Sequence, residues 1–405
     1  MRVSTAFNRM LALPGATVSG VRFEPDGMVV EIRLRARRLV CPCGWSTRAR
    51  YDSSRRRWRH IDAAGCRLWL EADIRRLLCR RCDRVVTEAV PWARPGAWHS
   101  RDFEDVVAWM AQRADKTTIA ALLRCSWKAV DNIIRRVVAQ HLDASRLEGL
   151  YRIGVDEISY RRGHRYLTVV ADHDSGKVVW VAKGKRGQAL QDFYDALGPQ
   201  GRDRIEAVSM DLSTIYTAAT KDALPEATIC YDPFHVIQIA NRAVDLVLSA
   251  SRHGADGKLT GPQWRAARVA LRSGAEKLKT DQKQLVNAFA RTSRRVYRAW
   301  ELKEALRYLY RVDYDLVRPY LKAWITAALR SRLPAFRNLA RTIRTNFDGI
   351  CAAVELGLSN SRLEGINAKI RLIQRRGYGY HSVEALAASI YLCLGGITVR
   401  LPTRP

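Results

Sequence analysis

Two aspartates stand where they could hold metal ions together. Asp156 lies at the end of an apolar run at residues 151–158, and Asp211 directly follows another apolar run at residues 204–210. Two carboxylates placed side by side repel each other strongly unless a cation lies between them. Oxygen ligands with room for a phosphate suit Mg²⁺ or Mn²⁺. The sequence therefore predicts a divalent-metal site for phosphoryl transfer, with two ions in each active site.

A third acid comes from a helix predicted at residues 359–374. Its apolar residues form one stripe, and Asn360, Glu364, Asn367 and Arg371 form a separate polar stripe. Glu364 is the only acid between Glu355 and Glu384, and it is surrounded by basic residues. We expect Glu364 to be a metal ligand beside a DNA-backbone track that includes Asn367, Lys369 and Arg371. The alternative is an ordinary surface Glu–Arg pair on the helix.

The order of predicted elements explains how these acids could meet. Three strands at residues 151–158, 165–172 and 177–183 form an antiparallel meander, followed by helix, strand 204–210, helix and strand 227–230. This is the order of a ribonuclease-H-like fold, in which the ends of the first and fourth strands lie side by side. Asp232 and His235 follow the fifth strand and are expected as accessory residues. A long helical tract then extends over about residues 236–357.

The charge balance points to a polyanionic partner. The 405 residues contain 69 Lys and Arg against 40 Asp and Glu, a formal net charge of +29. Compositional bias can explain why Arg exceeds Lys, but it does not explain the excess over acids. Nucleic acid is the first candidate, and a cationic partner is disfavoured.

Residues 101–140 predict a helix-turn-helix. A helix starts at Asp102, Thr117 or Thr118 caps a short second helix, and Ser126 caps a third. Apolar residues of the third helix face inward, which leaves a polar set that suits a recognition helix in the major groove: Lys128, Asn132, Arg135 and Arg136. Helical hairpins with basic faces are common, so the alternative is a solvated surface. Arg56, away from this helix, is expected to hold only the phosphate backbone.

Two cysteine pairs in the first region predict a zinc ribbon. Cys41 and Cys43 are separated from Cys79 and Cys82 by 35 residues. Four thiolates can close a tetrahedral site and replace the core that a small unit lacks. The single residue between Cys41 and Cys43 departs from the usual spacing, so Cys66 or His60 could substitute as a ligand. The alternative is a set of incidental buried thiols or a degenerate relic.

The segment 90–96 is rich in proline and is predicted to be a hinge.

Several of these runs together resemble a known family. They are Ile153-Gly-Val-Asp156-Glu, Gly163-His-Arg-Tyr-Leu-Thr-Val-Val170, Met210-Asp211, Tyr231-Asp-Pro-Phe-His-Val236, and Ser359-Asn…Glu364-Gly-Ile-Asn-Ala-Lys369…Gly377-Tyr-Gly-Tyr380. The chain resembles bacterial insertion-sequence transposases of the ISL3 family, which carry an Asp-Asp-Glu catalytic domain. The resemblance implies that Asp156, Asp211 and Glu364 are the catalytic triad. The 152 residues between Asp211 and Glu364 imply a helical insertion.

The resemblance also implies the reaction and the partners. Water nicks double-stranded DNA at the element's ends, and the freed 3′-hydroxyls then join to target DNA. Two ends require two active sites, so a dimer or larger homo-oligomer on DNA is expected. Two alternatives are a catalytically silent DNA-binding regulator derived from a transposase and a structure-specific nuclease of the same fold. All three acids are present, which disfavours the first, and the helix-turn-helix disfavours the second.

The sequence thus predicts a multidomain α+β and α/β protein. The expected parts are a zinc-ribbon-like β domain at residues 1–95, a helix-turn-helix at residues 100–145 and the ribonuclease-H-like domain at residues 150–405. Residues 1–15 lack an apolar stretch of the signal-peptide type, and no window approaches the roughly 18 apolar residues of a membrane span. We expect no membrane partner and a cytoplasmic, nucleoid-associated location with reduced thiols.

Overall fold

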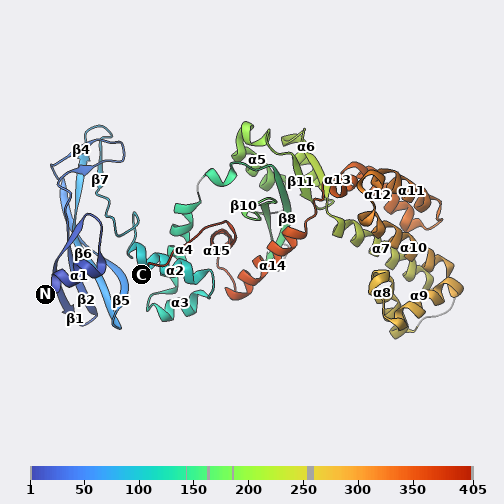
Figure 1. The fold of residues 1–405 in the computed structure, drawn as a ribbon, viewed down its shortest axis with the longest axis horizontal. Helices are drawn as coiled ribbons and strands as arrows, with labels where there is room; N and C mark the ends of the chain where they lie inside the picture. Colours follow the sequence, from blue (N-terminus) through green and yellow to red (C-terminus); the bar gives the residue numbers. More distant parts are fainter. Residues whose placement is uncertain (1, 143, 162–164, 185–186, 253–259, 403–405) are drawn as a thin grey trace. The chain divides into compact units, whose positions relative to one another are not determined.

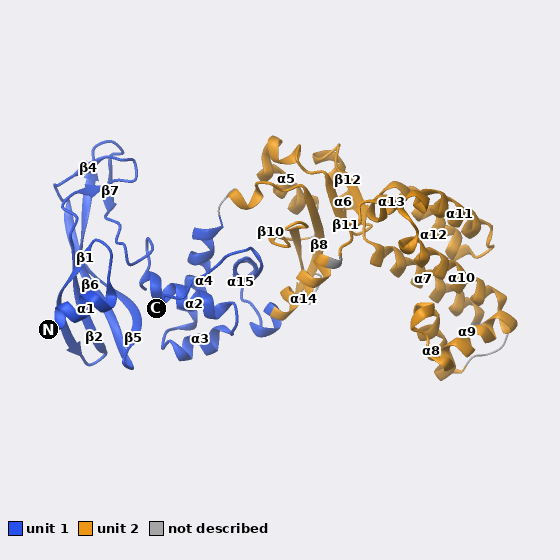
Figure 2. Ribbon diagram, in the orientation of Figure 1, with its two compact units in different colours: residues 1–143, 373–405 blue, residues 144–372 orange. Residues whose placement is uncertain are grey.

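The chain folds into two compact units. The computed structural model describes residues 2–142, 144–161, 165–184, 187–252 and 260–402. The first unit contains Met1–Asp143 and Ile373–Pro405, and the second contains Ala144–Leu372 (Figure 2). Gly163 and His164 of the quoted family motif lie outside the described residues, as do residues 253–259 of the predicted helical tract.

The first unit begins with a five-stranded sheet in the order β1-β2-β6-β5, with β7 pairing with β6 (Figure 1). Strands β2 and β6 are parallel, and the other neighbours are antiparallel. A helix, α1, packs against β1. The bounds are α1 (Val3–Leu11), β1 (Ala16–Glu24), β2 (Gly27–Leu34), β5 (Asp52–Ala63), β6 (Cys66–Cys79) and β7 (Arg84–Thr87), with a small hairpin of β3 (Leu39–Val40) and β4 (Ser46–Thr47).

This sheet has a hydrophobic core of its own, which the prediction of a small ribbon missed. Val30, Trp58, Leu70 and Trp92 are among the buried residues of one apolar cluster. The cysteine region contributes a separate, smaller cluster around Leu39 and Leu77. The expectation that a metal replaces a missing core is therefore wrong, because long alternating strands bury enough apolar surface without one.

The proline-rich segment at residues 90–96 contains no helix or strand, as predicted, but it is not a free hinge. The Trp92 ring packs edge-on against Trp58 with 5.5 Å between ring centroids. Arg94 is buried and pairs with Glu104 and Asp105 of the following helix. Aromatic burial and paired charges fix the segment in place, which proline content alone does not reveal.

Three helices follow in the predicted order: α2 (Arg101–Ala111), α3 (Lys116–Leu122) and α4 (Trp127–His141). The Ser126 hydroxyl accepts a hydrogen bond from the Ala129 backbone and caps α4, as predicted. The cap of α3 is Asp115 rather than Thr117 or Thr118, because its carboxylate accepts from both threonine backbone N–H groups. A last helix, α15 (Val383–Leu394), packs against α4.

The second unit is built on a sheet in the order β10-β9-β8-β11-β12 (Figure 1). Strands β8, β9 and β10 form the predicted antiparallel meander, while β8, β11 and β12 are parallel. Their bounds are β8 (Arg152–Arg161), β9 (Arg165–Asp172), β10 (Val178–Lys183), β11 (Ala207–Met210) and β12 (Thr228–Tyr231).

Helices connect and follow these strands. α5 (Gly187–Arg202) leads to β11, and α6 (Thr214–Ala223) leads to β12. In the described residues, seven α-helices lie between β12 and α14 (Ser361–Arg376), which carries Glu364. They are α7 (Pro233–Arg252), α8 (Gly261–Arg272), α9 (Thr280–Thr292), α10 (Arg294–Tyr308), α11 (Val317–Arg330), α12 (Pro334–Thr345) and α13 (Phe347–Glu355). Trp324 is buried and donates to the Leu302 carbonyl, which is a core role.

Close packing of α14 on β8 depends on Gly154. A Cβ atom at this glycine would lie 2.0 Å from Leu363 Cδ1 and 3.0 Å from both His173 Nε2 and Ser209 Oγ. Leu363 is buried, so its side chain has little room to move away. The absence of a side chain at residue 154 therefore sets how near the helix lies to the strand.

We expect Gly154→Ala to lower the free energy of unfolding by about 1–3 kcal/mol, because an overpacked core must shift. Gly365→Ala on α14 is the matched control, since a Cβ there meets no atom within 4 Å. That change should be neutral or stabilise by up to about 1 kcal/mol through helix propensity. Chemical denaturation of both variants measures the difference, and equal stability of the two would contradict the packing argument.

Candidate functional site

The sheet of the second unit places three acids beside one another. In the parallel pairing of β8 with β11, Gly154 lies opposite Ser209, and in that of β11 with β12, Met210 lies opposite Tyr231. Continuing each strand in the same register brings Asp156, Asp211 and Asp232 to corresponding positions. The carboxyl ends of adjacent parallel strands are where α/β sheets place functional side chains. Asp156 and Asp211 are half-buried, and Asp232 is buried.

His235, in the first turn of α7, joins two of these acids. Its Nδ1 lies 2.7 Å from Asp211 Oδ1 and 2.8 Å from Asp232 Oδ2. A single N–H cannot serve two carboxylates fully, and the buried Asp211 Oδ1 makes no hydrogen bond of regular geometry with the described residues. Asp211, Asp232 and His235 bring their ligand atoms within 4.8 Å of one another, so together they could hold a metal ion.

Asn360, directly before α14, and Asn367, on the helix, connect it to the acids. The Asn367 amide donates to Asp156 Oδ2 over 2.5 Å. The Asn360 backbone N–H donates to Asp232 Oδ1 over 3.1 Å, and its side-chain oxygen accepts from Ser209 Oγ over 2.5 Å. Both asparagine side chains are buried. The sequence pattern placed Asn360 in the polar stripe, but nothing in it indicated the role of Ser209.

Glu364 lies on the same face of α14, between Asn360 and Asn367 and about one helical turn from each. Its side chain is exposed. The contacts with Asp156 and Asp232 therefore come from the flanking asparagines, and Glu364 is not part of the group of ligand atoms formed by Asp211, Asp232 and His235. Lys369 and Arg371 are exposed on the same helix. Asn367 was expected to contact DNA, but in this structure its amide donates a hydrogen bond to Asp156.

The ionisation of the site reflects its crowded charges. Burial, together with the charge of Asp211, raises the pKa of Asp156 to about 6, although hydrogen bonds from Glu157 and Asn367 favour the carboxylate. Burial opposes a charge on His235, but the carboxylates of Asp211 and Asp232 outweigh it and raise the pKa of His235 to about 10. Without another cation, the imidazolium supplies the positive charge that these acids require.

The four predicted cysteines lie together in the first unit. Cys41 and Cys43 follow β3, Cys79 ends β6 and Cys82 lies in the turn before β7. All four sulfur atoms are within 4.8 Å of one another, so the set could bind a metal ion despite the short first spacer. A turn closed by the Gly44 N–H and the Cys41 carbonyl, 2.9 Å apart, accommodates that spacer.

The two substitute ligands considered from the sequence do not join this cluster. Cys66 is exposed at the start of β6, and His60 is buried with its Nδ1 2.7 Å from Ser100 Oγ. Within the cluster, hydrogen bonding from the Trp45 backbone and from Cys82 lowers the pKa of Cys43 to about 6. A thiol that ionises readily is suited to metal binding.

The four polar residues predicted to face DNA on α4 differ in their exposure and in their contacts within the protein. Lys128 and Asn132 are exposed on α4. Arg135 pairs with Asp131 at 2.9 Å and donates to Ser382, and Arg136 pairs with the buried Glu104. The inward face is as predicted, since Val130, Ile133, Ile134 and Val137 are buried.

Comparison with known proteins agrees with this architecture. A model of the ISL3 transposase domain matches residues 153–390, and the helix-turn-helix domain of transposase family ISL3 matches residues 88–138. The chain belongs to the ISL3 family of insertion-sequence transposases. The predicted family, the transposase activity and the DNA-binding helix-turn-helix are thereby confirmed.

Full-length relatives support the same assignment. The transposase is 37% identical to the transposase for insertion sequence element IS1557 of Mycobacterium tuberculosis, covering 100% of this chain and 98% of the relative. It is 26% identical to the transposase for insertion sequence element IS1001 of Bordetella parapertussis, covering 89% and 90% of the two chains. Among the described residues, no helix of the transposase is long and apolar enough to cross a membrane.

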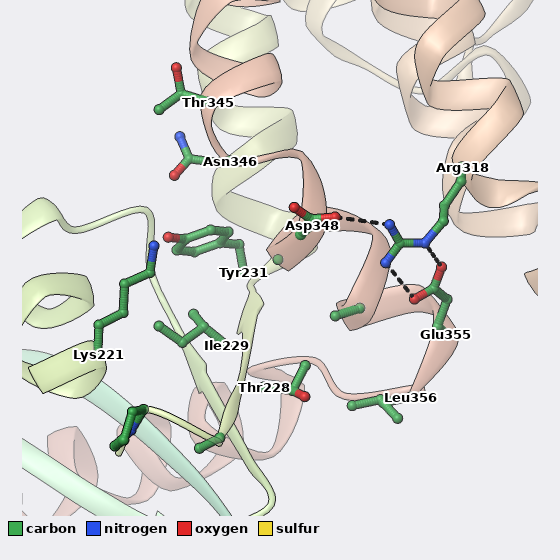
Figure 3. Close-up of a pocket in the computed structure, with 14 residues that line it drawn as sticks. Lys221, Thr228, Ile229, Tyr231, Arg318, Thr345, Asn346, Asp348, Glu355 and Leu356 are labelled. Atoms are coloured by element: carbon green, nitrogen blue, oxygen red, sulfur yellow. Dashed lines mark hydrogen bonds and ion pairs between the residues drawn. The ribbon is translucent and has the colours of Figure 1, made fainter. Parts of the chain in front are cut away.

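A cavity of about 610 Å³ in the second unit lies apart from the acids. It is bordered by the edge strand β12 and by α11 and α13, with Tyr231 and Ile229 on its wall (Figure 3). Arg318 there pairs with Asp348 and Glu355 at 2.9 and 2.8 Å, so its charge is neutralised. None of Asp156, Asp211, Asp232 or His235 lines this cavity.

We expect about one zinc ion per chain in the transposase, lost when Cys79 and Cys82 are both replaced by serine, because two of four thiolates disappear. The control is Cys66→Ser, which should keep its zinc because Cys66 lies outside the cluster. Elemental analysis of reduced, freshly purified protein measures the content. Absence of zinc from the unmodified protein would favour the degenerate-relic alternative.

We expect Asn132→Ala to cost roughly 1–3 kcal/mol in binding to the element's ends and to relax sequence preference, as lost base contacts do. Its exposed position on α4 makes a fold defect small. Titrations against terminal and scrambled duplexes measure both effects. An equal loss on both duplexes would mean that Asn132 contacts the backbone rather than a base.

Proposed function

We propose that Asp156, Asp211 and Glu364 are the catalytic triad of a ribonuclease-H-like domain. This domain nicks DNA at the element's ends and joins the 3′-hydroxyls to target DNA. The observation that carries the proposal is the parallel pairing of β8 with β11, because continuing its register beyond Gly154 and Ser209 puts Asp156 opposite Asp211. The mixed order β10-β9-β8-β11-β12 supports the fold assignment.

The residues present fit a divalent metal. Burial and the nearby charge of Asp211 raise the pKa of Asp156, and Asp211 shares the single His235 N–H with Asp232, so this group of acids has room for a further cation. Asp156, Asp211 and Glu364 offer oxygen ligands of the kind that Mg²⁺ or Mn²⁺ prefers. Two such ions per site would activate the attacking oxygen and neutralise charge on the leaving oxygen. Asp232 and His235 would act as accessory residues.

The surrounding side chains orient these ligands. Asn367 holds one oxygen of Asp156 through its amide, which fixes the direction of the other oxygen. His235 Nδ1 lies 2.7 Å from a carboxylate oxygen of Asp211 and 2.8 Å from one of Asp232, which holds these two carboxylates beside each other. Positioned ligands matter because phosphoryl transfer depends more on geometry and charge neutralisation than on covalent help from the protein.

The proposed domains are a ribbon-like β domain at residues 1–95, a helix-turn-helix at residues 100–145 and a catalytic domain at residues 150–405 with a helical insertion at about 236–357. The helices α7 to α13 support the insertion, since they separate β12 from α14. Residues 373–405 belong by their contacts to the first compact unit, so the catalytic domain would share its C-terminal segment with that unit.

The proposed substrate defines the remaining partners. DNA at the element's ends and target DNA both meet the site, which favours a nucleoid-associated location. Lys128, Asn132, Arg135 and Arg136 would contact the ends, and Lys369 and Arg371 would follow the backbone near the triad. Two ends need two active sites, so we propose a dimer or larger assembly on DNA.

We expect Asp156→Asn, Asp211→Asn and Glu364→Gln each to reduce nicking about a hundredfold or more, since several kcal/mol of transition-state stabilisation are lost. Binding should persist, because affinity comes from basic contacts elsewhere. The assay incubates the full chain with Mg²⁺ and duplexes carrying the terminal repeats, and it detects 3′-end nicks. The control is Asp192→Asn, which removes one exposed negative charge from α5.

Asp232→Asn separates two possible ligand sets and should do less damage than the triad variants. If Asp232→Asn abolishes nicking while Glu364→Gln leaves it intact, the ligands are Asp156, Asp211 and Asp232. If the unmodified protein binds the ends but never nicks them, the silent-regulator alternative holds.

A further inference from the structure

A basic pocket in the first unit has no role in the proposed chemistry. It has a volume of about 580 Å³ and lies where β5, β6 and the segment 98–99 meet the start of α4. Six arginines line it and no acid does: Arg55, Arg56, Arg57, Arg59, Arg67 and Arg124. Such a concentration of guanidinium groups in a concave site is suited to a phosphate.

Carboxylates outside the pocket form ion pairs with four of these arginines. Asp62 pairs with Arg59 and Arg124, while Glu71 pairs with Arg55 and Arg57 at 2.7 and 2.5 Å. Arg59 is also buried, so its position is fixed. The four paired arginines thus build a rigid wall.

Arg56 and Arg67 differ from the other four because neither makes an ion pair with a described residue. Arg56 donates to the Ala97 carbonyl over 3.3 Å, and its guanidinium lies 5.3 Å from the Trp58 ring and 5.4 Å from the Trp98 ring. Arg67 is exposed at the start of β6. These two side chains leave positive charge in the pocket that an anion could neutralise.

Aromatic rings complete the lining. Trp98 is 67% exposed, which is unusual for so large an apolar side chain. Trp69 also lines the pocket, and its buried indole N–H has no hydrogen-bond partner among the described residues. Arginines interleaved with exposed aromatic rings are typical of surfaces that bind nucleic acids.

The position of the pocket indicates which nucleic acid it meets. Ser126 and Ala129, at the start of α4, form part of its lining. In helix-turn-helix proteins, the first residues of the recognition helix approach the base edges, so the DNA backbone passes this end of the helix. The expectation that Arg56 lies away from the recognition helix is therefore wrong, since strand β5 and the start of α4 enclose one pocket.

We propose that this pocket binds a backbone phosphate of the same duplex that α4 reads, with Arg56 and Arg67 as the pairing side chains and Trp98 covering the adjoining sugar. The N-terminal sheet is then part of the end-binding surface and sets the register of the recognition helix on DNA. Phosphate contacts of this kind position a protein without specifying sequence. The proposal rests on DNA binding by the helix-turn-helix, but not on the catalytic triad.

The test uses the full chain, a labelled duplex copied from the terminal repeat and a scrambled duplex of equal length. The double variant Arg56→Gln with Arg67→Gln should lose about tenfold in affinity on both duplexes, and its salt dependence should weaken by about the slope of one or two phosphate contacts. Arg35→Gln with Arg37→Gln removes the same charge from exposed positions outside the pocket and should have a smaller effect.

A second measurement locates the phosphate. Duplexes with a single neutral methylphosphonate are scanned along the site, and one position should weaken the unmodified protein but not the pocket variant. Equal losses in the pocket and control variants, or no such position, would overturn the proposal while leaving DNA binding intact. No binding of the unmodified protein to either duplex would contradict the proposed function as well. Unchanged zinc content and thermal unfolding of the variants exclude a folding defect.

Discussion

Repulsion between carboxylates at the ends of parallel strands is the constraint around which the second unit is arranged. Asp156 lies within β8, while Asp211 and Asp232 directly follow β11 and β12, and continuing the parallel register of these strands brings the three acids to corresponding positions. The raised pKa of Asp156 means that its ionisation near neutral pH opposes folding as long as no cation is present, and this cost disappears below the pKa of the unfolded chain. His235 reduces the repulsion through its contacts with two of the acids.

Residues on both sides of Glu364 connect helix α14 to the aspartates of the sheet. The helix approaches β8 closely because Gly154 has no side chain, and buried Leu363 occupies the space. Asn360 and Asn367 then fix it with hydrogen bonds to Asp232 and Asp156. The asparagine groups are neutral, so these hydrogen bonds add no positive charge beside the carboxylates. Glu364 lies on α14 between these two asparagines, and its side chain is exposed.

In the first unit, the connecting segment fixes the N-terminal sheet to the helix-turn-helix. The cysteine cluster, the N-terminal sheet and the three helices belong to one compact body, and buried Trp92 and Arg94 fasten the connecting segment to both sheet and helices. A connection of this kind holds α4 and the basic pocket beside it in a fixed relation. Rigid placement lets backbone contacts made by the sheet determine where the recognition helix lies on DNA.

The sequence by itself determined the elements whose residues repeat with a clear period or bear distinctive chemistry. The meander and the two following strands, the inward face of α4, the four cysteines and the family were all predicted, because apolar periodicity and motif spacing are local properties of the chain. Tertiary structure alone decided which polar groups meet. The Asn367–Asp156 bond joins residues 211 positions apart, and Arg94 closes a supposed hinge by pairing with α2. Likewise, only folding brought Arg56 to the start of α4, because contacts between distant segments depend on how strands and helices pack, and no local pattern records that packing.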